Sequence, residues 1–168
     1  MKKYYFTLLL IGVLYSTPIA QSFNHSIIKH TLKAGNDTLL RVLAKPQKGF
    51  HYEYLLYLPK KVIPNKKVNL LVEPNNTGRV HDDIKVHYRF AFSQACISSI
   101  GNLVARHLNI PLLVPIFPRP RSNWRMYTHA LDKETIWSKE KTTQRIDLQL
   151  LAMIKDAQQV LKNWDIQT

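Results

Sequence analysis

Four side chains that could bind a metal ion lie close together in the middle of the chain: His81, Asp82, Asp83 and His87. Asp83 and His87 are four residues apart, so on a helix they would share one face, as zinc ligands on a single helix do. An aspartate that caps a helix, beside an exposed histidine, accounts for the same residues more simply. We therefore expect structural roles for this group and no metal site.

A second polar group lies in the segment Pro118–Thr142, where His129 and Asp132 are three residues apart, near Arg119 and Arg125. A histidine oriented by a carboxylate is the base of a serine hydrolase, but it needs a nucleophile beside it. No serine or cysteine can be identified as its partner, and a local hydrogen bond is the more common use of such a pair. The sequence also contains no Gly-x-Ser-x-Gly, no His-Glu-x-x-His and no phosphate-binding glycine loop.

The segment Glu73–Gly78 carries the strongest indication of function. It follows a short apolar run, Val68–Val72, which predicts a strand buried on both faces. The carboxyl end of a parallel strand is where open α/β sheets bind ligands, and backbone N–H groups in such a loop can stabilise an oxyanion. An ordinary β-turn explains the same residues equally well.

Apolar runs and turn residues predict the elements that would position these side chains. Two strands flank a turn at Ala34–Asp37, and a third strand, rich in aromatic residues, ends at Pro59. Strands and helices then alternate, which is typical of a largely parallel sheet covered by helices. The predicted strands are His25–Leu32, Thr38–Leu43, Tyr52–Leu58, Val68–Val72 and Pro111–Phe117, and the predicted helices run from about Asp82 to Leu108 and from about Thr143 to Trp164.

Helical spacing of apolar residues marks the buried face of each predicted helix. Asp82 or Asp83 would cap the first helix, and Asn109, followed by Pro111, would end it. The expected faces are Phe92, Cys96, Ile100, Leu103 or Val104, and Leu108 in the first helix, and Ile146, Leu150, Ile154, Ala157, Leu161 and Trp164 in the second. At the start of the second helix we expect Arg145 and Asp147 to form an ion pair or to clamp a loop.

The beginning of the chain has the pattern of a signal peptide. Lys2 and Lys3 precede an uncharged apolar stretch, Tyr4–Tyr15, and small residues follow. The stretch is shorter than the roughly 20 residues of a membrane-spanning helix, so residues 1–22 predict a cleaved leader that leaves no stable membrane anchor. Residues 23–168 would then form one exported domain, periplasmic or extracellular.

The chain is strongly basic, with 24 lysines and arginines against 11 acidic residues and a net charge of +13. Such a charge favours anionic surfaces. The basic residues are scattered, with no run long enough for a nucleic-acid-binding arm, so we expect no specific nucleic-acid partner. The single cysteine, Cys96, excludes an intramolecular disulfide and is expected to be a buried, inert side chain.

Several motifs, in order along the chain, resemble the front part of exported bacterial α/β-hydrolases. They are Tyr54–Pro59, Leu70–Gly78, Pro115–Pro120, Tyr127–Asp132 and Arg145–Leu150. The resemblance implies the N-terminal part of an α/β-hydrolase sheet, an early strand hairpin followed by β-α-β-α, truncated before the nucleophile strand. It also implies an oxyanion loop at Asn75, Asn76 and Thr77 and a pocket wall that includes Arg119, Trp124, Tyr127 and His129.

In that family the nucleophile strand pairs with the strand that corresponds to Val68–Val72, and the serine, the acid and the histidine come later. The resemblance therefore implies an incomplete serine hydrolase, inactive alone and without a cofactor, whose complete form cleaves an ester or amide bond in a small-molecule or polymeric substrate. An open apolar strand edge would make the chain marginally stable. The alternatives are a non-catalytic exported basic module that binds an anionic polymer or partner protein, and a split enzyme completed by a separate C-terminal half.

Overall fold

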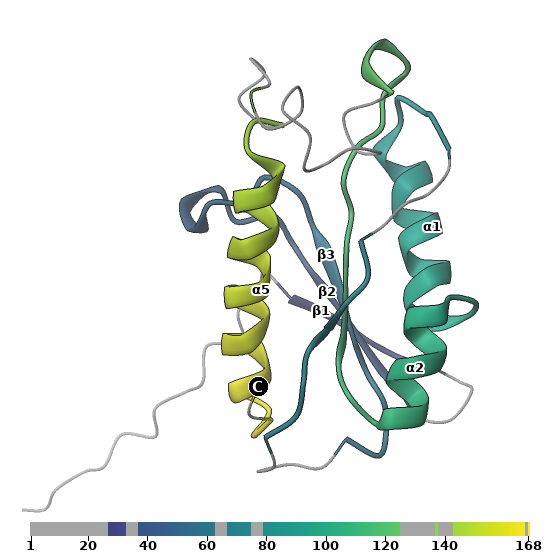
Figure 1. The fold of residues 1–168 in the computed structure, drawn as a ribbon, viewed down its shortest axis with the longest axis vertical. Helices are drawn as coiled ribbons and strands as arrows, with labels where there is room; N and C mark the ends of the chain where they lie inside the picture. The colour runs from purple at the N-terminus through teal and green to yellow at the C-terminus, as the bar shows by residue number, and fades with distance from the viewer. Residues whose placement is uncertain are drawn as a thin grey trace, which may run out of the picture.

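A five-stranded mixed sheet with helices on both faces forms the centre of the molecule (Figure 1). This computed structural model describes residues 27–32, 37–62, 67–74, 79–124, 137, 143–166 and 168. The strands are β1 (Ile27–Thr31), β2 (Thr38–Val42), β3 (Tyr54–Leu58), β4 (Leu71–Val72) and β5 (Leu112–Pro115). The helices are α1 (Ile84–Cys96), α2 (Ile100–Leu108) and α5 (Ile146–Lys162), with short 3₁₀ helices at Pro46–Lys48 and Arg121–Asn123.

The strands lie in the order β1-β2-β3-β5-β4. The pairs β1–β2, β2–β3 and β3–β5 are antiparallel, whereas β4 pairs parallel to β5. α1 and α2 connect the two parallel strands, so this part of the chain is a β-α-β crossover. The mixed α/β class, the early strand hairpin and the approximate positions of the strands are confirmed. The expectation of a largely parallel sheet is wrong for the described strands, because β4 and β5 form the one parallel pair among them.

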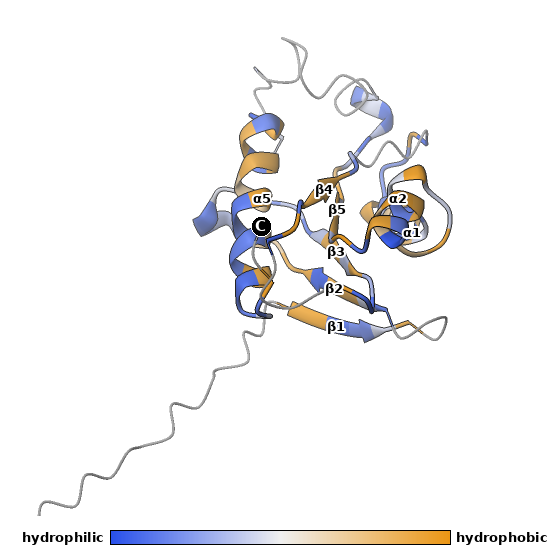
Figure 2. Ribbon diagram, turned by 60° about the horizontal axis from the view of Figure 1, so that its bottom comes forward, coloured by the Kyte–Doolittle hydropathy of each residue, from blue (hydrophilic) through white to orange (hydrophobic). Residues whose placement is uncertain are grey.

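Alternation along the strands divides the core into two layers. In β3 the side chains of Tyr54, Leu56 and Leu58 pack toward α5, while Leu55 and Tyr57 pack toward α1 and α2. β2 and β5 alternate in the same way, because successive side chains on a strand point to opposite faces. Figure 2 shows the result, a sheet with α5 on one side and the α1–α2 pair on the other.

The prediction of a single long helix from Asp82 to Leu108 is wrong, because two helices occupy this range. Asp83 caps α1 as predicted, and α1 ends at Cys96. Ser99 then begins α2 by accepting a hydrogen bond from the backbone N–H of Asn102 at 2.9 Å, and Asn109 ends it in the left-handed conformation, as expected. A serine in extended backbone conformation offers the chain a new helix start, which apolar spacing alone does not reveal.

The break also changes which side chains are buried. Ile100 and Leu103, expected in the core, are 81% and 69% exposed, and Leu108 is exposed as well. Ala91, Ala95, Ala105 and the amide of Asn102 are buried against the sheet in their place. Small residues allow the two helices to lie close to the strands, and the larger aliphatic side chains of α2 face outward.

Two further expectations on burial need correction. β4 has only two residues, and the side chains from Val68 to Val72 are partly buried or exposed, because β4 lies at the edge of the described sheet. In α5, Ile146, Ala157 and Leu161 are buried as predicted, whereas Leu150 and Ile154 are only partly buried. The buried face also includes four residues that were not predicted: Gln149, Met153, Asp156 and Val160. Trp164, predicted to be buried, is exposed.

The predicted leader, residues 1–22, lies outside the described residues. Within the part of the chain that the structure describes, none of the helices has the length and apolarity needed to cross a bilayer.

Candidate ligand-binding pocket at the carboxyl edge of the sheet

The loops that follow β4 and β5 meet at one edge of the sheet. Because the two strands are parallel, their carboxyl ends point the same way, and the backbone N–H of His81 donates to the carbonyl oxygen of Arg119 at 2.9 Å. The backbone N–H of Arg121 donates to Oδ1 of Asp82 at 2.8 Å. This is the edge at which open α/β sheets bind ligands.

The four residues considered as metal ligands form local hydrogen bonds at this edge. Nδ1 of His81 accepts from the backbone N–H of Asp83 at 2.9 Å, and Oδ1 of Asp83 accepts from the backbone N–H of Lys85 at the same distance. Nε2 of His87, a buried side chain, lies 2.8 Å from the carbonyl oxygen of His81 and 3.3 Å from the backbone nitrogen of Arg119. These contacts connect the two loops and cap α1.

The predicted pocket-wall residues are only partly within the described chain. The Arg119 side chain is largely buried, and its Nε donates to the carbonyl oxygen of Trp124 at 2.8 Å. The side chain of Trp124 is exposed. Tyr127 and His129 lie outside the described residues, as do Asp132 and the oxyanion-loop candidates Asn75, Asn76 and Thr77. The structure therefore brings Arg119 and Trp124 together and does not describe the other members of the set.

Glu73, the first residue of the predicted oxyanion segment, is held against α2. Its backbone N–H donates to the carbonyl oxygen of Leu113 at 3.0 Å, and its Oε2 accepts from Oγ of Ser99 at 2.5 Å. Gly101 makes this approach possible, because a Cβ at that position would lie 2.1 Å from the same carboxylate oxygen. The start of the loop after β4 is thus fixed to the helix that follows it.

A pocket of about 900 Å³ opens at the same edge, between α1 and the carboxyl ends of β2 and β5. This volume lies within the usual range of small-molecule sites. Its apolar lining comes from the end of β2, the loop before β3, the first turns of α1 and the chain after β5. The residues are Ala44, Tyr52, Ile84, Tyr88, Ile116 and Pro118.

Arg41 forms the polar centre of this pocket. Nε of Arg41 donates to Oε2 of Glu53 at 2.6 Å and Nη2 donates to Oε1 at 3.0 Å, a bidentate ion pair between β2 and the residue that precedes β3. The guanidinium also lies over the ring of Tyr88, 4.6 Å from its centroid. The hydrogen bonds to Glu53 raise the pKa of Arg41 above its ordinary value, so Arg41 stays charged.

Sequence analysis did not identify this pocket, although two signals for it are present. Arg41 lies two positions after the buried Leu39 in the same strand, so its side chain shares the α1 face of the sheet. Lys85, Tyr88 and Arg89 are three and four residues apart, which places them on one face of a helix. That these two sets meet depends on the pairing of β2, β3 and β5, which no local pattern reveals.

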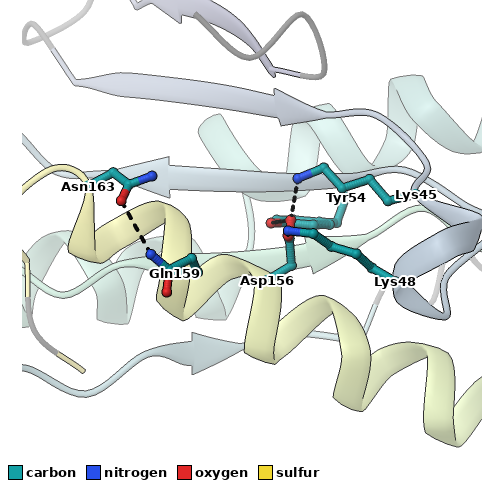
Figure 3. Close-up of polar contacts among 6 residues, drawn as sticks. All are labelled: Lys45, Lys48, Tyr54, Asp156, Gln159 and Asn163. Carbon is teal, nitrogen blue, oxygen red and sulfur yellow. Dashed lines mark hydrogen bonds and ion pairs between the residues drawn. The ribbon is translucent and has the colours of Figure 1, made fainter. Parts of the chain in front are cut away.

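A second polar cluster, on the opposite face of the sheet, is structural. Oδ2 of Asp156 on α5 accepts from Nζ of Lys45 at 2.7 Å and from the hydroxyl of Tyr54 at 2.9 Å, and Oδ1 accepts from Nζ of Lys48 at 2.5 Å (Figure 3). Burial alone would raise the pKa of Asp156, but the hydrogen bonds from Lys45, Lys48 and Tyr54 together lower it below its ordinary value. Burial next to this carboxylate raises the pKa of Tyr54. Each polar group has a partner, so the cluster attaches α5 to the sheet.

The remaining candidates also have structural environments. Arg145 and Asp147 form the expected ion pair, with Nη2 2.8 Å from Oδ2. Cys96 is partly buried, and burial raises the pKa of its thiol to about 12, so the thiol is protonated at neutral pH. Within the described residues, no set of three or more His, Cys, Asp or Glu side chains is arranged to hold a metal ion.

The fold and the pocket define a mixed α/β domain with a candidate ligand site at the carboxyl edge of its sheet. No family model matches the sequence, and no curated protein matches it. A crystal structure of a thermostable esterase is similar to it, with 24% sequence identity, a TM-score of 0.40, and coverage of 84% of this chain and 32% of that chain. The chain thus spans about a third of the length of that esterase.

Proposed function

We propose that this chain is the N-terminal part of an α/β-hydrolase-fold serine hydrolase, which cleaves an ester or amide bond through an acyl-enzyme. In this proposal the described strands form the first part of the sheet, and Asn75, Asn76 and Thr77 supply the oxyanion loop. The nucleophilic serine, its histidine base and the orienting acid come from polypeptide outside these 168 residues. The chain alone then has no hydrolase activity.

The parallel pairing of β4 with β5 carries this proposal. It brings His81, which follows the proposed oxyanion residues in sequence, beside Arg119 in the segment after β5. The outer side of β4 carries no other strand in the described residues, and it is the side on which the nucleophile strand pairs in α/β-hydrolases. The order of motifs along the chain supports the same assignment.

We also propose that residues 1–22 direct export and are removed, which leaves an exported domain. The basic character of the chain is compatible with the anionic polymers of a cell envelope, as substrates or as neighbours. The substrate of the complete enzyme is proposed only as a class, a small or polymeric ester or amide.

Reading the coding sequence beyond the Thr168 codon in all three frames tests the proposal first. We expect a short apolar strand followed by Gly-x-Ser-x-Gly, either in frame or after a frame shift. The extended protein should then react with a fluorophosphonate probe at that serine, while the 168-residue chain should not react. Unrelated sequence in every frame, or labelling of the 168-residue chain itself, would contradict the proposal.

A basic binding module is the second candidate, favoured by the net charge of +13. Such a module would be a soluble monomer that holds an anionic polymer with an affinity that falls steeply as salt is added. A hydrolase part with an open strand edge would instead aggregate, and a separate C-terminal half would restore its solubility. Size-exclusion chromatography at two salt concentrations, with and without polyanion, separates these behaviours.

A further inference from the structure

Both carboxylates that line the pocket beside α1 are already engaged. Glu53 binds the guanidinium of Arg41 through both of its oxygens. Asp83 caps α1 by accepting from the backbone N–H of Lys85. The lining carries three cationic side chains, Arg41, Lys85 and Arg89, against these two carboxylates, so its net charge is positive.

Two cations on the helix wall of the pocket are not engaged in this way. Lys85 and Arg89 both line the pocket, and neither forms an ion pair with any residue in the described part of the chain. They are four residues apart on α1, where two like charges destabilise a helix. A bound anion between them would relieve this repulsion, and the first turn of α1 contributes further positive potential.

Apart from His51 and the Arg41–Glu53 pair, the rest of the lining is largely apolar. Tyr52, Ile84, Ile116 and Pro118 form a surface that a charged group alone would not fill. The pocket thus combines an apolar floor with a positive rim, and a ligand that satisfies both parts has an anionic end and an apolar body.

We propose that this pocket binds a small molecule that carries a carboxylate or phosphate ester on an apolar or aromatic body, with the anion held by Lys85 and Arg89. The proposal goes beyond the proposed hydrolase function and does not depend on it, because binding needs no catalytic residue. It can therefore hold for the chain even if the hydrolase assignment fails.

Calorimetric titration of the full chain with three probes of one shape tests the proposal: 4-methylbenzoate, 4-methylphenyl phosphate and the neutral 4-methylbenzamide. At least one anion should bind clearly more tightly than the amide, and the stronger of the two identifies the ligand chemistry. Replacing Lys85 and Arg89 together by Gln should weaken binding of that anion roughly tenfold, about 1.4 kcal/mol, since both of the nearby surface charges are removed. Lys155→Gln with Lys162→Gln, which removes two exposed charges from α5, should change the affinity less than about twofold.

A second variant, Ile84→Asp, keeps the test valid if the double variant folds poorly. Aspartate is favoured in the first turn of a helix, so α1 should be retained while the new charge repels the anion from the pocket. The proposal would be overturned if neither anion bound, or if the amide bound as tightly as the anions. It would also be overturned if the α1 and α5 double variants lost affinity equally, or if Ile84→Asp bound the anion as tightly as the wild type.

Discussion

The carboxylate of Asp156 on α5 accepts a hydrogen bond from Nζ of Lys45 at 2.7 Å, although the two residues are 111 positions apart in the sequence. Both side chains are almost completely buried, with exposed fractions of 2% and 6%. An ion pair in such a position stabilises the fold only while both partners are present, because either charge alone would remain buried without compensation.

Asp156→Asn should therefore destabilise the protein strongly. The amide leaves the buried ammonium of Lys45 without a counter-charge, and we expect a loss of roughly 3 kcal/mol in the free energy of unfolding, measured with urea. Asp165→Asn is the matched control, because it makes the same chemical change at an exposed position just beyond α5. Equal effects of the two substitutions would show that the buried pair contributes nothing particular.

The same carboxylate makes stability depend on pH. The pKa of Asp156 is lowered in the folded protein from an ordinary value of 3.8, so its contribution is present above that pH and is lost as the pH falls through the folded value. Urea unfolding of the wild type at a series of pH values from neutral to acidic should show this loss. Asp156→Asn should show a smaller loss over the same range, and parallel curves would assign the acid sensitivity to other carboxylates.

Cys96 should react slowly with thiol reagents in the native protein. Burial raises the pKa of its thiol to about 12, so the reactive thiolate is scarce at neutral pH. We expect the rate of modification by a chromogenic disulfide to rise by several orders of magnitude in denaturant. Rapid modification in native buffer would mean that the thiol is accessible and would contradict its placement beside the sheet.

Ser99→Ala should weaken the start of α2. The substitution removes the cap of the Asn102 N–H and the contact with Glu73, and we expect a cost of about 1 kcal/mol in urea unfolding. Ser98→Ala is the control, since the neighbouring serine makes only an exposed contact with Ser93. If α1 and α2 instead formed one continuous helix, Ser99→Ala would leave stability unchanged or raise it.

The strands could be predicted from sequence because each is a short apolar run between turn residues. The break at Ser99 could not, since apolar residues continue at helical spacing across it and give no sign that the phase changes. In α5, Gln149 and Asp156 interrupt the apolar pattern, which shifted the predicted face away from the true one. A charged residue on the inward face of a helix is stable only with a partner, and its partners, Lys45, Lys48 and Tyr54, lie far away in the sequence.

One part of the candidate site was predictable from the sequence. The loops after β4 and β5 meet because the two strands are parallel, which places their carboxyl ends at the same edge of the sheet. The pocket around Arg41 was not predictable, since it is assembled from β2, α1 and the segments after β2, before β3 and after β5, which meet only through the pairing of the strands. Arg41 looks like an ordinary surface residue until Glu53 and Tyr88 are placed around it.

The distance along the chain between Lys45 and Asp156 also determines when the domain can fold during its synthesis. A ribosome adds on the order of 5–20 residues per second, so Lys45 waits roughly ten seconds before the carboxylate that neutralises it is made. Until then the sheet cannot bury the face that α5 covers, because doing so would bury an uncompensated ammonium. We expect the nascent chain to stay unfolded until α5 has emerged, and this delay is compatible with the proposed export.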